Sequence, residues 1–140
     1  MKTYFPRGAE WRIWDLQVHT PFSELNNGFG SDPEAYAKSF FEKAIEKEVA
    51  VVGVTDYFTV DGYRYLTELQ NDDARLGDLV GEAQLESAKR IRLFANVEMR
   101  CDIIVNGSRV NFHVLFSDEI PADDIENHFL HQLQQTSQNS

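Results

Sequence analysis

The stretch VAVVGVTDYF, residues 49–58, constrains the fold more than any other, because it is the densest run of β-branched residues in the chain. Such a run is typical of a strand that is buried on both faces, as in a parallel sheet. Before it, RIWDLQVHT (12–20) alternates apolar and polar residues, which predicts another strand. PEAYAKSFFEKAIEKE (33–48) predicts a helix, with Asp32 as its N-cap and Pro33 in its first turn. The sequence therefore favours an α/β architecture over a helix bundle or a β-sandwich.

The same alternation continues toward the carboxyl end. Further segments predict helices from about Gly62 to Leu69 and from about Gly81 to Arg90, a strand over 91–100, and a helix over 122–133. Asn106 and Gly107 stand between two apolar stretches, and this dipeptide is a strong signal for a β-hairpin. We therefore expect one antiparallel excursion in an otherwise regular β/α order.

The composition restricts the class of protein. With 140 residues, of which 42% are hydrophobic, the chain has the size of one globular domain. It carries 23 acidic and 13 basic residues, and a formal net charge of -10 argues against a general nucleic-acid binder because it repels phosphate. The single Cys101 cannot form an internal disulfide, and no apolar run follows the polar start. We expect a cytoplasmic protein with no membrane span.

Polar side chains of the kinds that bind metals recur at the ends of the predicted strands. With a period of two, one face of the first strand carries Asp15, Gln17 and His19. Its other face carries Trp14, Leu16 and Val18. Functional groups gather at the carboxyl ends of strands in parallel α/β folds. By this reasoning we expect four residues to converge, namely His19, Asp56, Glu98 and His113.

Four short motifs, DLQVHTPFS, GVTDYF, NVEMR and FHVLF, follow one another along the chain. In order and spacing they resemble the first motifs of the PHP (polymerase and histidinol phosphatase) superfamily of metal-dependent phosphoesterases. The longer runs WDLQVHTPFSELNNGFG, VVGVTDYFTVDGY and NFHVLFSDEI are similar to the amino-terminal PHP region of large AAA-like ATPases of the TrlF type, some of which are associated with defence against phage. The resemblance spans nearly the whole chain.

The resemblance implies a fold and a context. The expected fold is α/β, the N-terminal part of a distorted (β/α)7-type barrel, with a mainly parallel sheet, outer helices and one β-hairpin. Residues 1–135 would form this incomplete PHP-like domain, since a complete β/α barrel typically needs ~250 residues. Residues 136–140 would be a disordered tail. The implied partner is an ATPase domain or a separate chain, and exposed surface of the incomplete barrel could lead to self-association.

The resemblance also assigns the metal ligands, position by position. His19, Glu98 and His113 match family ligands, and Glu24 lies near where some relatives place another. Gln17 and Tyr57 stand where the family has histidines. An amide is a poor ligand for Zn²⁺, although it can bind Mg²⁺ or Mn²⁺, and a neutral phenol is rarely a ligand. These two substitutions should weaken or redirect metal binding.

Asp56 and Glu98 each have a structural interpretation as well as a functional one. Asp56 belongs either to the catalytic site, where it would orient a metal ligand, or to a buried cap at the end of its strand. Glu98 is either a metal ligand or a carboxylate that is neutralised by a nearby arginine, for which the candidates are Arg12, Arg92 and Arg100.

Two functions of different classes are compatible with these residues. In the first, a divalent cation (Mn²⁺, Mg²⁺ or Zn²⁺) bound by His19, Glu98 and His113 activates water to attack a phosphoester, in a small substrate or a nucleic acid of the parent protein. The missing histidines indicate that this activity is impaired here. In the second, the chain is a non-catalytic scaffold or sensing module that docks on an ATPase domain or a partner chain.

Overall fold

The fold comes from a computed structural model, which describes residues 11–23, 28 and 30–133. Glu24 and the expected tail over residues 136–140 lie outside the described residues. The elements in chain order are β1(Ile13–Val18), α1(Pro33–Glu46), β2(Val49–Tyr57), α2(Asp61–Asn71), α3(Asp73–Val80), η1(Glu82–Gln84), α4(Leu85–Arg90), β3(Arg92–Val105), β4(Ser108–Leu115), α5(Ala122–Ile125) and the π-helical turn η2(Glu126–Leu130).

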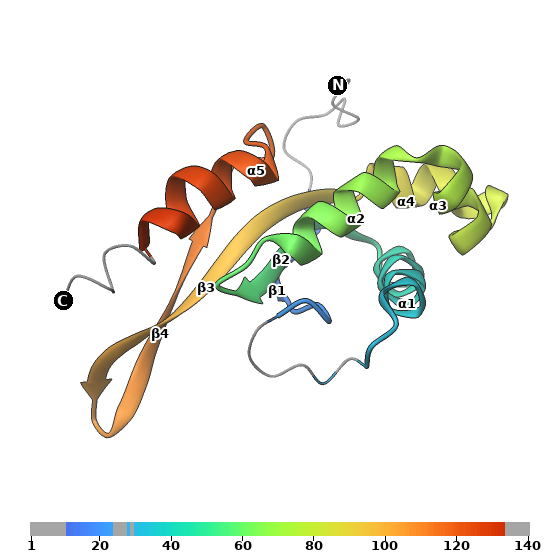
Figure 1. The fold of residues 1–140 in the computed structure, drawn as a ribbon. Helices are drawn as coiled ribbons and strands as arrows, with labels where there is room; N and C mark the ends of the chain where they lie inside the picture. Colours follow the sequence, from blue (N-terminus) through green and yellow to red (C-terminus); the bar gives the residue numbers. More distant parts are fainter. Residues whose placement is uncertain (1–10, 24–27, 29, 134–140) are drawn as a thin grey trace.

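The described strands form one mixed sheet in the order β1-β2-β3-β4 (Figure 1). β1 and β3 both run parallel to β2, whereas β4 runs antiparallel to β3. The expected fold class is therefore wrong: the sheet is a curled, mixed half-barrel and not the mainly parallel wall of a (β/α)7-type barrel. The physical reason lies after β3, where a two-residue turn leads straight into β4. A parallel connection needs a crossover of a dozen or more residues.

The hairpin between β3 and β4 is where the sequence predicts it. Its turn residues, Asn106 and Gly107, have φ angles of 51° and 80°. Both lie in the left-handed region, which a two-residue hairpin turn of this type requires and which asparagine and glycine tolerate best. β3 is longer than predicted, because it continues through Val105 and carries the hairpin away from the rest of the molecule (Figure 1).

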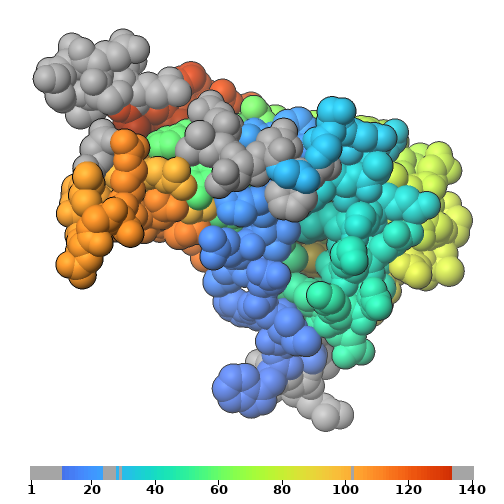
Figure 2. Space-filling view, turned by 90° about the horizontal axis from the view of Figure 1, so that it is seen from below, coloured from blue at the N-terminus to red at the C-terminus, as the bar shows by residue number. Residues whose placement is uncertain are grey.

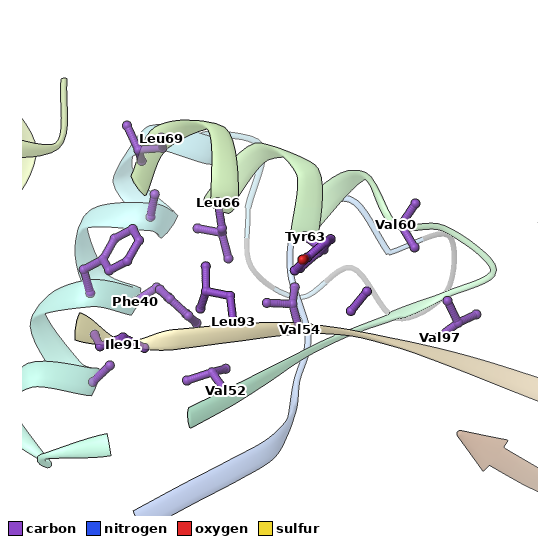
Figure 3. Close-up of a cluster of buried hydrophobic side chains, with 14 of the residues drawn as sticks. Phe40, Val52, Val54, Val60, Tyr63, Leu66, Leu69, Ile91, Leu93 and Val97 are labelled. Atoms are coloured by element: carbon purple, nitrogen blue, oxygen red, sulfur yellow. The ribbon is translucent and has the colours of Figure 1, made fainter. Parts of the chain in front are cut away.

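The hydrophobic core lies between the sheet and the helices that cover one of its faces (Figure 3). Apolar residues of β2 and β3 form one side of the core, and residues such as Phe41 of α1 and Leu66 of α2 form the other.

α1 begins as predicted, since the Asp32 side chain accepts hydrogen bonds from the backbone N–H groups of residues 34 and 35. α3 was not predicted. Its Leu76 is fully buried in the core, which stabilises a short, glycine-containing helix.

β1 departs from the predicted pattern of one apolar and one polar face. Trp14 is 61% exposed and Leu16 is 36% exposed, so neither belongs to the core, while Val18 packs against it. The register of β1 against β2 shifts between Asp15 and Val18, and this irregularity breaks the strict alternation. Figure 2 shows β1 at the surface, between the hairpin and α1.

Candidate functional site

The centre of the candidate site is a row of three side chains across the sheet. Tyr57 of β2 is the register partner of Glu98 of β3, and Glu98 is the register partner of His113 of β4. Register partners point to the same face of a sheet. The structure therefore brings Glu98 and His113 together, as the sequence predicts, and it adds Tyr57 beside them.

His19, which follows the end of β1, completes this group. Its Nε2 lies 3.2 Å from Oε2 of Glu98, and the Glu98 side chain is only 3% exposed. This is the distance of an ion pair. The two groups are not aligned as a hydrogen bond, and Glu98 Oε2 has no hydrogen-bond partner among the described residues. Nδ1 of His19 is also buried without one in this part of the chain. The imidazole and the carboxylate thus lie side by side through Nε2 and Oε2, and each keeps a buried polar atom without a hydrogen-bond partner in the described residues.

The backbone around His19 is held by three hydrogen bonds from two other elements. The Tyr36 hydroxyl of α1 donates to the His19 carbonyl oxygen at 2.6 Å. Asp56 of β2 accepts from the backbone N–H of Thr20 at 2.8 Å and from its hydroxyl at 2.7 Å. Such anchoring fixes the position of the imidazole before any ligand binds.

Asp56 acts on the site through this anchoring. It is 1% exposed, and it alternates in β2 with Tyr57, so it points toward the helix-covered face and not toward Glu98. Burial raises the pKa of its carboxyl, although the two hydrogen bonds from Thr20 act in the opposite direction. We therefore interpret Asp56 as a positioning residue.

Tyr57 covers the imidazole at the point where the resemblance implies a histidine. The two rings are stacked, with centroids 5.4 Å apart and planes 18° from parallel. The phenol is 5% exposed, and burial, with the nearby Glu98 carboxylate acting in the same direction, raises its pKa. It therefore stays neutral near pH 7 and is a poor metal ligand.

Asn111 of β4 occupies the other oxygen of Glu98. Its amide nitrogen donates to Glu98 Oε1 at 2.7 Å and lies 3.3 Å from the Tyr57 hydroxyl. His113 Nε2 is 3.9 Å from the same Glu98 oxygen, which is too long for a hydrogen bond. Asn111 thus satisfies one oxygen of the carboxylate, while the other faces His19 without a hydrogen bond. Of the arginines that the sequence suggested for this role, Arg92 pairs instead with Asp118, at 2.6 Å.

These donors do not fit the metal centre that the resemblance implies. A catalytic zinc site typically has three protein ligands. Within the described part of the chain, no group of three His, Cys, Asp or Glu side chains is placed to hold a metal ion. The backbone N–H of Gln17 donates a hydrogen bond to Asp15, and the residue lines the hollow described below. His19 and Glu98 remain as a two-donor pair.

A hollow of about 370 Å³ opens beside this pair on the same side of the sheet. Apolar side chains of the two edge strands and polar residues line it. The apolar residues are Trp14, Leu16 and Leu115, and the polar residues are Asp15, Gln17, Asn96 and His113. The hollow is shallow and open to solvent, and its surface is mainly apolar.

Sequence reasoning missed the role of Asn111 and of the contact between Arg100 and Tyr57. A signal for both was present. Asn111 is two residues before His113, and Arg100 is two residues after Glu98, so each shares a strand face with a predicted ligand. The register that makes Arg100 and Asn111 partners across the hairpin is a tertiary feature.

No protein-family model matches the chain, and none of the curated proteins matches it. Within the described residues, no helix combines the length and the apolar character needed to cross a bilayer.

Proposed function

We propose that this chain is an impaired PHP-like phosphoesterase module, the amino-terminal piece of a larger ATPase-linked protein that acts in phage defence. The order of the four motifs, with ligand-type residues retained at His19, Glu98 and His113, supports the relationship. The cytoplasm is the compartment that we propose, in keeping with the single Cys101.

The proposal that the site is impaired rests on one observation, the stacking of Tyr57 on His19. Tyr57 puts a neutral phenol at the position of a lost ligand, and the centroid of its ring lies 5.4 Å from that of the His19 ring. Asn111 engages one oxygen of Glu98, which leaves the other oxygen and the His19 imidazole as the donors for a cation. A two-donor site of this kind holds Mn²⁺, Mg²⁺ or Zn²⁺ weakly and supports little hydrolysis.

The second candidate is a non-catalytic scaffold or sensing module that docks on an ATPase domain or a partner chain. The exposed apolar residues of β1 and of the hairpin favour it. Trp14 of β1 is 61% exposed and Ile104 of the hairpin is 66% exposed, and large exposed apolar side chains are typical of interaction surfaces.

Metal titration and a hydrolysis assay on the unmodified chain test the proposal. We expect weak binding of Mn²⁺ by calorimetry and no measurable hydrolysis of an aryl phosphodiester, with or without the metal. The matched control is Glu98→Gln, which keeps the size of the side chain but removes its charge and should abolish the remaining metal binding. Metal-dependent hydrolysis by the unmodified chain that is lost in Glu98→Gln would overturn the claim of impairment.

A further inference from the structure

Arg100 lies on the sheet face that carries Tyr57, Glu98 and His113, and neither proposed function uses its charged side chain. It follows Glu98 by two residues on β3 and is half-buried. Within the part of the chain that the structure describes, no carboxylate lies within ion-pair distance of its guanidinium. Arg64 and Arg92, by contrast, contact carboxylates at 3.0 Å (Asp123) and 2.6 Å (Asp118). An uncompensated guanidinium is unexpected in a chain whose net charge is -10.

Neutral contacts hold Arg100 in place. Its Nε donates to Asn111 Oδ1 at 3.3 Å, and its Cζ lies 5.4 Å from the centroid of the Tyr57 ring. Both contacts position the guanidinium, and the second is a cation–π interaction. A terminal nitrogen is 3.5 Å from the Tyr57 hydroxyl, a distance that marks only a weak hydrogen bond. The fork of N–H donors is therefore oriented but still has capacity for an acceptor.

Glu98 does not take up this capacity, although it is near in the sheet. Its oxygens face Asn111 and His19. The planar guanidinium suits an oxyanion that accepts two parallel hydrogen bonds, and phosphate is such a group. His113, whose side chain is 33% exposed, belongs to the neighbouring register pair and also lines the hollow beside the site.

We propose that Arg100 binds the phosphate group of a phosphate ester on the sheet face that carries Tyr57, Glu98 and Asn111. This inference rests on the proposed function in its choice of a phosphate ester as the ligand class. It adds the residue that recognises the phosphate, and binding requires no metal.

The test is calorimetric titration of the metal-free chain with phenyl phosphate. Arg100→Ala should weaken binding roughly tenfold or more, as expected for loss of hydrogen bonds to a charged group. Arg100→Lys, which keeps the charge but loses the fork, should give an intermediate affinity. The matched control is Arg92→Ala on the same strand, because the Arg92 guanidinium is already paired with Asp118. The Arg92→Ala variant should bind phenyl phosphate with the affinity of the unmodified chain.

Three results would overturn the inference: no binding by the unmodified chain, equal affinity in Arg100→Ala, or equal losses in Arg92→Ala and Arg100→Ala. Equal affinity for benzoate would overturn the assignment to phosphate. A thermal melt of each variant separates loss of binding from loss of folding, and Arg100→Lys provides the comparison if Arg100→Ala unfolds. Hydrolysis of a phosphodiester by the unmodified chain would contradict the impairment and leave the role of Arg100 intact.

Discussion

Nε2 of His19 lies 3.2 Å from Oε2 of Glu98, although a whole strand separates their own strands in the sheet. The intervening strand β2 contributes Tyr57, and the imidazole reaches Glu98 while stacked on its ring. The strand order, the Tyr57 ring and the anchored backbone at Thr20 together fix this contact. The pair is therefore sensitive to changes on β1, β2 and β3 alike.

The double substitution Gln17→His with Tyr57→His should raise the affinity for Mn²⁺ or Zn²⁺. Each imidazole adds a nitrogen ligand near a pair that already offers two donors, and position 57 faces Glu98 across the register. Some loss of stability should accompany it, because the smaller ring leaves a void where Tyr57 packs. Calorimetric metal titration of the double variant and the unmodified chain measures the difference. Equal affinities would mean that the remaining groups do not form a preorganised centre.

The buried carboxyl of Asp56 should make stability depend on pH. Burial raises its pKa above the ordinary value of 3.8, so the folded state binds this proton more tightly than the unfolded state. Its contribution to the free energy of unfolding is therefore largest at low pH and falls as pH rises through the raised pKa. In the Asp56→Asn variant, the side chain at position 56 cannot ionise. As the pH rises from about 4 to about 7, the free energy of unfolding should therefore fall less in this variant than in the unmodified chain.

Urea denaturation at both pH values measures this difference. Asp78→Asn, which changes an exposed aspartate on α3, is the control and should follow the unmodified chain. An identical pH dependence in Asp56→Asn and the unmodified chain would contradict the expected role of the buried carboxyl.

Gly53→Ala should destabilise the chain by separating β1 from β2. A Cβ atom at residue 53 would lie 2.8 Å from the carbonyl carbon of Leu16, and backbone atoms cannot yield as a flexible side chain can. The expected loss is about 1–3 kcal/mol in the free energy of unfolding, measured by urea denaturation. Gly28→Ala is the matched control, since no heavy atom of the described residues lies within 4 Å of its added Cβ. It should change stability by less than about 0.5 kcal/mol. Similar losses in both variants would argue against the close approach at Leu16.

The chain on its own should self-associate through its exposed apolar strands. Trp14 of the edge strand β1 is 61% exposed, and Ile104, near the tip of the β3–β4 hairpin, is 66% exposed. In the order β1-β2-β3-β4, the strands β1 and β4 are edges of the described sheet. Sedimentation velocity should show a mean mass that rises with protein concentration. The double substitution Trp14→Glu with Ile104→Glu adds charge to both surfaces and should reduce the association. A monomer at every concentration, with a cooperative melt, would refute the prediction.

Local signals in the sequence determined the elements that depend on near neighbours. The N-cap at Asp32 and the turn at Asn106 and Gly107 are of this kind, because a few adjacent residues decide the backbone angles. The strand over Val49–Tyr57 was also predictable, since a run of buried β-branched residues fits few other structures. The same period of two identified Glu98 and His113 as residues of one chemical surface.

Only the tertiary structure decided how these elements combine. The order β1-β2-β3-β4, with β2 and β3 inside and β1 and β4 at the edges, depends on how the sheet packs against the helices. The exposure of Trp14 results from the place of β1 at an edge. Which of the adjacent residues Asp56 and Tyr57 points toward the helices results from the packing of β2 in the sheet. Contacts such as Asn111 with Glu98 depend on strand register, which is set by packing across the whole sheet and not by the residues of either strand alone.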